Sequence, residues 1–232
     1  MGIRLRAASV IGPAHAKAGL PNQDAVLIRQ GRWGWLAVVS DGMGSRSRAD
    51  IGARTLCRSA WQSVRQLPFD CSNEVWVDTL YRRWLARLDE LQIAPNDAIT
   101  TCLLAWGLPD GRFRLAQLGD GLILGDPTPS KGLTSRNISS FSNLTLGLGL
   151  SKSIEDWQFN EGRLIKPGDG LILMTDGIAD DLGNTDGLVQ TLIMDMRHRG
   201  ARAARAMLVR DLSNWPTARH SDDKTIALIF RI

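Results

Sequence analysis

The stretch VVSDG at residues 38–42 decides how the rest of the chain is interpreted. A continuous apolar run there predicts a buried strand, and Asp41 stands at its end. The same pattern returns in LMTDG at 173–177, which contains Asp176, while Asp222 precedes another apolar strand-like run. An ionised aspartate at the rim of an apolar strand must be solvated, paired or bound to a cation. The three aspartates together predict a carboxylate-built metal centre.

Length and composition predict one domain over residues 1–232. The chain is 44% hydrophobic and 22% charged, which suits a globular domain with a substantial core. No apolar run approaches the roughly 20 residues of a membrane helix, and the first residues alternate like a strand rather than open a signal peptide. We therefore expect a cytoplasmic protein with no membrane partner. An odd number of cysteines argues against a disulfide framework, and we expect three buried thiols, Cys57, Cys71 and Cys102.

The basic charge of the chain is mild. The net charge is +4. We interpret a group of arginines as the solvated face of one predicted helix. Its members are Arg197, Arg199, Arg202, Arg205 and Arg210. No aromatic residues interleave with the basic ones, so nucleic acid is not an expected partner.

Hydrophobic periodicity predicts an α+β protein. Helices are predicted at 47–67, from 77 to near Pro95, and within 187–213. Strands are predicted at 3–10, 24–29, 34–40, 98–107, 112–118, 121–125, 156–165, 170–175 and 225–231. Two strand blocks, each followed by a helix pair, favour two antiparallel sheets packed together with helices outside. The segment 126–156 is rich in small polar residues and is either a flap beside the site or a disordered loop.

Six short motifs follow one another along the chain. They are GPAH at 12–15, PNQDA at 21–25, DGMG at 41–44, GDG at 119–121, TDG at 175–177 and DDKT at 222–225. An Asp-Gly pair alone is common, but this ordered set resembles that of the metal-dependent PPM phosphatases, the type 2C Ser/Thr protein phosphatases. The resemblance, to the compact bacterial-type members, spans nearly the whole chain. It implies a four-layer αββα sandwich with a two-metal centre, Mn²⁺ or Mg²⁺, between the sheets at one end.

The resemblance also implies a set of metal ligands. Asp41 would bridge both ions, the Gly42 carbonyl would ligate one, and Asp176 and Asp222 would ligate the other. Hard divalent cations prefer such oxygen donors and keep several waters. Two ions about 3.5–4 Å apart can lower the pKa of a shared water and present hydroxide to phosphorus, without a covalent phosphoenzyme.

Two further aspartates have weaker expected roles. Asp24 would sit beside the ions and hold a metal-bound water, so that it joins Asp41 and Asp176 as a catalytic candidate. Asp120 matches a position that contributes, with Asp176, to a third and weaker metal site in several members. The structural alternatives are a turn or strand-start aspartate at position 24, a hairpin Asp-Gly at position 120, and a helix cap at position 176.

Four positions depart from the family pattern. Gln23 stands where many members carry Glu, so we expect weaker affinity for one ion. His15 occupies the segment of a phosphate-binding arginine, and it either binds substrate phosphate or is a plain loop histidine. Met43 replaces a histidine proposed in some members as general acid. Asp223 replaces a common Asn, which leaves open whether Asp222 or Asp223 coordinates.

The other polar candidates have blander interpretations. His198 and His220 belong to no zinc-type ligand pattern, and His220 lies either at the cleft rim or on the surface. Thr100 and Thr101 match a family strand motif and are predicted to be structural.

The implied function is removal of phosphate from serine or threonine of a phosphorylated protein, opposite a Ser/Thr kinase. Gln23 and the missing arginine motivate an alternative, a pseudophosphatase that binds a phosphoprotein or kinase without turnover. A third possibility is hydrolysis of a small phosphorylated metabolite.

Overall fold

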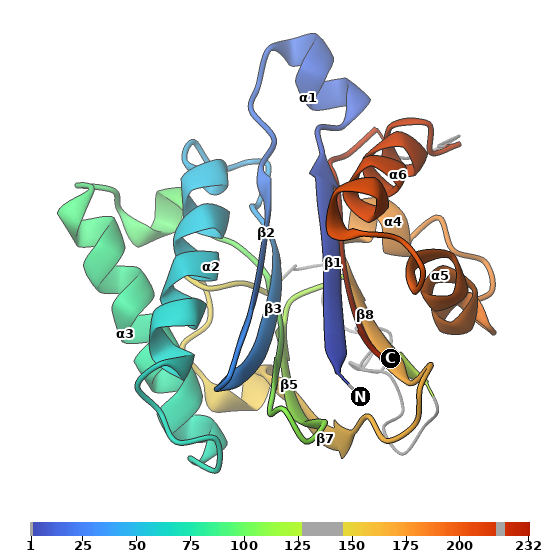
Figure 1. Cartoon of the computed structure of the whole chain (residues 1–232). Helices are drawn as coiled ribbons and strands as arrows, with labels where there is room; N and C mark the ends of the chain where they lie inside the picture. The colour runs from blue at the N-terminus through green and yellow to red at the C-terminus, as the bar shows by residue number, and fades with distance from the viewer. Residues whose placement is uncertain (1, 127–145, 217–220) are drawn as a thin grey trace.

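Two antiparallel β-sheets pack face to face, and helices cover both outer faces (Figure 1). The computed structural model describes residues 2–126, 146–216 and 221–232. In Figure 1 the layers run from α2 and α3, through a five-stranded and a four-stranded sheet, to α5 and α6. The predicted αββα sandwich is confirmed.

The two sheets do not correspond to the two blocks of strands predicted along the sequence. The four-stranded sheet has the order β1 (Ile3–Val10), β9 (Lys224–Arg231), β8 (Gly170–Met174) and β6 (Leu122–Asp126). The five-stranded sheet has the order β2 (Asp24–Gly31), β3 (Gly34–Asp41), β4 (Cys102–Gly107), β5 (Arg112–Leu118) and β7 (Gln158–Arg163). The first and last strands of the chain therefore lie side by side. The turn between β5 and β6 crosses from one sheet to the other, so Asp120 is not in a hairpin.

The main helices lie close to their predicted positions. They are α2 (Ala49–Val64), α3 (Asn73–Glu90), α5 (Leu188–Met196) and α6 (Ala201–Ser213). Gly200 lies between α5 and α6. Its backbone is extended, so α5 cannot continue through it, and it is the residue that precedes the first turn of α6. The prediction of one helix carrying five arginines is wrong, since Arg197 and Arg199 lie in the turn between α5 and α6.

Two short helices lie near the predicted motifs. Residues Pro13–Ala18 form α1, which places His15 on a helix and not in the loop that was one expectation. Proline at the first helical position favours this helix, and Gly19, with φ 67°, ends it in the left-handed conformation. The second is α4 (Asp176–Ala179), which begins at Asp176.

Strand β3 shows why an apolar run marks a buried strand here. Val38 packs in the core between the five-stranded sheet and its helices, and its neighbour Val39 packs in the core between the sheets. Successive side chains of a strand point to opposite faces, so a strand covered on both faces must be apolar throughout. A third core lies between the four-stranded sheet and its helices.

Several smaller expectations need correction or fall outside the described residues. Cys57 and Cys102 are buried, but Cys71 is only partly buried because it lies in the loop before α3. The strand predicted at 98–107 starts only at Cys102. Most of the expected 126–156 loop, and His220, lie outside the described residues. Within the described ranges, no helix is long and apolar enough to cross a bilayer.

Candidate metal centre

Five aspartates from both sheets meet at one end of the sandwich. Asp24 begins β2 and is the register partner of Asp41, the last residue of β3. Asp176 follows β8, whose last residue Met174 pairs with Ile226 near the start of β9. The other two aspartates lie in the segments that enter β6 and β9. The antiparallel pairing of these strands brings together residues far apart in the sequence.

Three of the carboxylates are close enough to share an ion. Oxygen atoms of Asp41, Asp120 and Asp176 lie within 4.8 Å of one another. Asp24 and Asp222 are also near, since their negative charges raise the pKa of Asp41. The structure therefore gathers the predicted acidic residues, while their roles as ligands stay a prediction.

Burial and crowding oppose ionisation of this group. Burial is the largest cause that raises the pKa of Asp41 well above its usual value, followed by the neighbouring carboxylates. Burial, then the charges of Asp120 and Asp222, raise the pKa of Asp176 to about 6. Burial also raises the pKa of Asp24 to about 7, although hydrogen bonds with Thr225 and Thr175 act in the opposite direction. Such a cluster is costly to ionise unless a cation neutralises it.

The backbone of Asp41 is fixed by two threonines. The Thr100 hydroxyl donates to the carbonyl oxygen of Asp41 at 2.7 Å, and the Asp41 amide donates to Thr101 Oγ1 at 2.9 Å. Ser40 joins them through hydrogen bonds to Thr100 and to the Thr101 carbonyl. These contacts hold the end of β3 against the start of β4, as predicted for a structural threonine pair.

A similar relay holds Asp24. The Thr175 hydroxyl donates to Asp24 Oδ2 at 2.9 Å and accepts from the Thr225 amide at 3.1 Å. Sequence reasoning assigned no role to Thr175 or Thr225. The available signal was a threonine within two residues of an aspartate in both TDG and DDKT.

Gly42 is required by packing as well as by its expected carbonyl role. A Cβ at this position would lie 2.4 Å from the carbonyl oxygen of Ala49, at the start of α2. The Gly42 amide donates to the Gln23 carbonyl at 3.2 Å. The glycine therefore lets α2 begin directly beside the acidic group.

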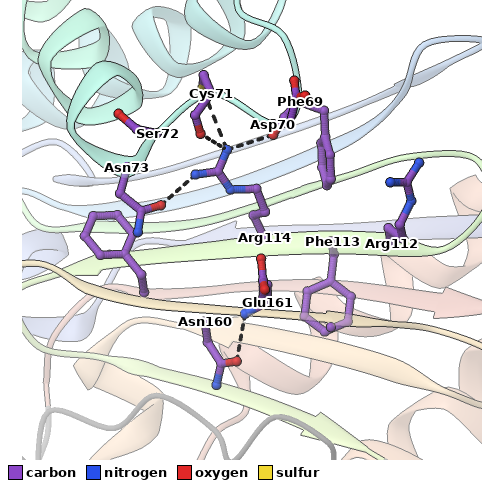
Figure 2. Close-up of a pocket in the computed structure, with 12 residues that line it drawn as sticks. Phe69, Asp70, Cys71, Ser72, Asn73, Arg112, Phe113, Arg114, Asn160 and Glu161 are labelled. Atoms are coloured by element: carbon purple, nitrogen blue, oxygen red, sulfur yellow. Dashed lines mark hydrogen bonds between the residues drawn. The ribbon is translucent and has the colours of Figure 1, made fainter.

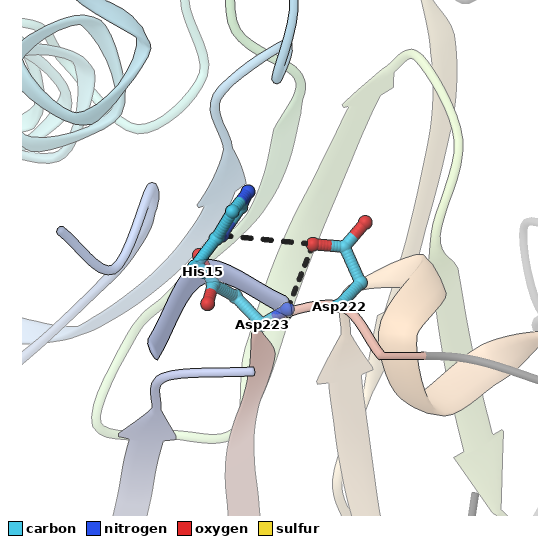
Figure 3. A group of neighbouring side chains, drawn as sticks. All are labelled: His15, Asp222 and Asp223. Carbon is cyan, nitrogen blue, oxygen red and sulfur yellow. Dashed lines mark hydrogen bonds and ion pairs between the residues drawn. The ribbon is translucent and has the colours of Figure 1, made fainter. Parts of the chain in front are cut away.

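The adjacent residues Asp222 and Asp223 differ in exposure and in hydrogen bonding (Figure 3). The side chain of Asp223, only 1% exposed, accepts from the amides of Gly12 and Gln23, both at 2.6 Å. The Asp222 side chain is 44% exposed and accepts from the Asp223 amide at 2.8 Å. Both carboxylate oxygens of Asp223 thus accept hydrogen bonds from the backbone, which favours Asp222 as the ligand of the pair.

Glycines clamp the same segment from two sides. A Cβ on Gly12 would lie 2.2 Å from the backbone carbon of Asp222, and one on Gly177 would lie 2.1 Å from the Asp223 carbonyl oxygen. Backbone atoms cannot yield cheaply at such distances, so both positions require glycine. The GPAH and TDG motifs therefore meet at the DDKT motif.

His15 lies beside this pair. Its Nδ1 is 2.9 Å from Asp223 Oδ2 and 4.0 Å from Asp222 Oδ1 (Figure 3). The contact with a buried carboxylate orients the ring at the edge of the acidic group. A role in binding substrate phosphate remains a prediction.

The residues fit a divalent metal ion. Within the described part of the chain, no lysine or arginine pairs with Asp24, Asp41 or Asp176. Lys224 Nζ donates to the main-chain oxygen of Asp222 at 2.8 Å. The buried Gln23 Oε1 also lacks a hydrogen-bond partner among the described residues. Crowded carboxylate oxygens are the hard donors that Mg²⁺ and Mn²⁺ prefer.

A pocket of the described surface lies away from the acidic group. A pocket of about 830 Å³ lies between the loop before α3 and strands β5 and β7 (Figure 2). Arg114 spans it and donates to the carbonyls of Phe69 and Cys71, both at 2.7 Å, and to Asn73 Oδ1 at 2.6 Å. Because Arg114 lies toward the start of β5, opposite the Asp120 end, this pocket is separate from the acidic group.

Comparison with known proteins agrees with this geometry. A family model for protein phosphatase 2C matches residues 11–215. The chain therefore belongs to the protein phosphatase 2C family. No curated protein matches it.

Solved structures share the fold. PppA, a key regulatory component of T6SS in Pseudomonas aeruginosa, is similar at TM-score 0.67 and 17% identity, over 100% of this chain and 99% of that one. The catalytic domain of the serine/threonine phosphatase PstP, in complex with 2 manganese ions, has TM-score 0.67 and 16% identity, over 99% and 98%. RsbX, in complex with magnesium, has TM-score 0.64 and 13% identity, over 99% and 95%.

Proposed function

We propose that this chain is a metal-dependent phosphatase that removes phosphate from phosphoserine or phosphothreonine in proteins. The observation that carries the proposal is the group of neighbouring carboxylates at one end of the sandwich. Among the described residues, no lysine or arginine pairs with its members Asp24, Asp41 and Asp176. The family membership and the solved complexes of relatives with manganese or magnesium support Mn²⁺ or Mg²⁺ as the cofactor. An opposing Ser/Thr kinase would supply the phosphorylated protein.

Each residue has a proposed task at this centre. Asp41 would hold two ions together, with the Gly42 carbonyl on one side and Asp176 and Asp222 on the other. Asp120 would add a third, weaker position next to Asp176. Two ions bound there would activate a water and polarise the phosphoryl group.

The surrounding side chains would orient substrate and water. Asp24, held by the Thr175 hydroxyl, would accept a hydrogen bond from the bound solvent and fix its orientation. His15, held by Asp223, would face the substrate phosphate from the edge of the site. Met43 lines a recess of about 20 Å³ beside Asp41 and offers no proton. The leaving serine or threonine oxygen would therefore take its proton from solvent at the centre or from another group.

Turnover with added metal tests the proposal. The chelator-treated protein should release phosphate from phosphoserine and phosphothreonine peptides only after Mn²⁺ or Mg²⁺ is added. Asp41→Asn and Asp176→Asn should each lower kcat/KM about 1,000-fold, since several kcal/mol of charge stabilisation are lost. Asp186→Asn, a change at an exposed aspartate that belongs to none of the motifs, is the matched control.

The second candidate is a pseudophosphatase that binds a phosphoprotein or kinase. It is favoured by Gln23, whose neutral amide replaces a negative charge, and by the absence of an arginine at the His15 segment. Metal binding with turnover at background on all phosphopeptides would support it. Activity on small phosphate esters alone would instead indicate a metabolite substrate.

A further inference from the structure

A second charged site lies at the opposite end of the four-stranded sheet. It is a pocket of about 210 Å³ built from separate segments of the chain, and we call it the arginine pocket. Its lining comes from β1, the turn before β8, α5 and the turn after it, and the end of β9 with the residue that follows. The residues on which the argument depends are Arg4, Ile193, Arg197 and Arg231.

The lining is cationic and contains no acidic side chain. Within the described residues, Arg4, Arg197 and Arg231 form no ion pair. Arg4 Nη1 donates to the main-chain oxygen of Arg197 at 2.7 Å, and Arg231 Nη1 donates to that of Leu164 at 3.0 Å. Carbonyl contacts fix the guanidinium groups of Arg4 and Arg231 without neutralising them.

A neighbouring guanidinium reports the same positive field. The Arg6 side chain donates to the carbonyl of Arg199 at 2.9 Å and lies next to Arg4 on strand β1. Burial, and then the positive charge of Arg4, lower the pKa of Arg6. Arg4 and Arg6 thus both contact main-chain oxygens of the turn between α5 and α6, where Arg197 also lies.

The arginine pocket is not part of the metal centre. Along the β1–β9 ladder, Arg4 pairs with Phe230 at one end, and Val10 pairs with Lys224 beside Asp222 at the other. Val10 is six positions beyond Arg4 on the strand, which corresponds to about 20 Å. A ligand of one acidic group in this pocket therefore cannot touch the aspartates.

Size and chemistry restrict the ligand to one anionic group. Pockets for drug-sized ligands measure roughly 300–1,000 Å³, so this pocket is too small for one. A guanidinium presents a planar fork that matches a carboxylate or phosphoryl group. Ile193, which is 3% exposed, supplies an apolar wall beside the cations.

We propose that the arginine pocket binds a carboxylate or phosphoryl group on an acidic segment of a protein partner. A recess with fixed guanidinium groups and an apolar wall suits a side chain with its carbon stem. Attraction to an anionic bilayer relies instead on several basic residues spread over a surface. The site is independent of the proposed phosphatase reaction.

Peptide binding to the chelator-treated protein tests this site, because no metal then recruits anions to the other end. The probes are fluorescein-labelled peptides in which a leucine is flanked by three glutamates or by three phosphoserines. Anisotropy is measured at low and high NaCl. Arg197→Glu should weaken binding at least tenfold, and Arg197→Ala to a smaller extent. The control Arg205→Glu makes the same charge change at an exposed position on α6 outside the pocket, and it should alter affinity less than twofold.

The outcomes separate the alternatives. Preference for one of the two peptides identifies a phosphoryl or a carboxylate group as the ligand. Equal loss in Arg197→Glu and Arg205→Glu would show diffuse attraction only and overturn the site. No peptide binding, or Arg197-dependent sedimentation with phosphatidylserine vesicles in its place, would also overturn it. Thermal melting of each variant checks that the fold is retained.

Discussion

The two ends of the four-stranded sheet differ in how they treat charge. At the aspartate end, carboxylates crowd together, and burial followed by the neighbouring negative charges raises the pKa of Asp41 and Asp176. At the arginine end, guanidinium groups are spread over separate segments and rest on backbone carbonyls. The same β1–β9 ladder joins both ends. Burial makes the difference, because a partly exposed arginine keeps its water while a buried aspartate needs a cation.

Removing Asp223 should break the aspartate end with the largest effect on stability. Asp223→Ala leaves the buried amides of Gly12 and Gln23 without an acceptor. An unsatisfied buried donor costs about 1–3 kcal/mol, so we expect a total loss of about 3 kcal/mol. Relief of repulsion with Asp24 offsets part of it.

Urea unfolding of the metal-free protein measures this change. Asp223→Asn is the control, since it keeps one acceptor oxygen and should lose about half as much. An Asp223→Ala variant as stable as the parent would show that the segment is held by the glycine clamp alone.

Changing pH should have the next largest effect. Asp24 and Asp176 have folded pKa values of about 7 and about 6, above the ordinary value of 3.8. The folded metal-free protein therefore binds more protons than the unfolded chain between pH 4 and 7. Its free energy of unfolding should fall as pH rises through this window, by about 1–3 kcal/mol from these groups.

The Asp24→Asn variant isolates this contribution. Comparison of urea unfolding at pH 5 and pH 7.5 should show a smaller decrease in the variant than in the parent. Saturating Mn²⁺ should reduce the decrease in the parent. Identical pH dependence in both metal-free proteins would mean that burial does not raise the pKa of Asp24.

Strand patterns predicted most of this architecture, and local detail was the part they missed. The apolar run before Asp41 correctly marked a strand covered on both faces. The motif set correctly predicted the family, and it correctly predicted that the acidic residues lie close together. The two sheets could not be assigned from sequence order, because β1 finds its partner at the far end of the chain. The hydrogen bonds of Asp223 could not be predicted either, since their donors are amides that only the fold brings near.

Changing Gln23 should have the smallest effect and sharpens the comparison. Gln23→Glu adds a negative charge beside the aspartates, so the metal-free protein should lose stability while Mn²⁺ affinity rises. A gain of about 1 kcal/mol corresponds to roughly fivefold tighter binding. Gln190→Glu makes the same charge change on the exposed side of α5 and should leave affinity unchanged. Weaker binding in Gln23→Glu would show that this side chain does not face the ions.

Calorimetric titration of Mn²⁺ into the chelator-treated protein tests the metal centre most directly. We predict two ions per chain for the parent and for Asp186→Asn, and loss of at least one ion in Asp41→Asn. Absence of binding to the folded parent at millimolar Mn²⁺, or an unchanged isotherm in Asp41→Asn, would contradict a metal centre built on these aspartates.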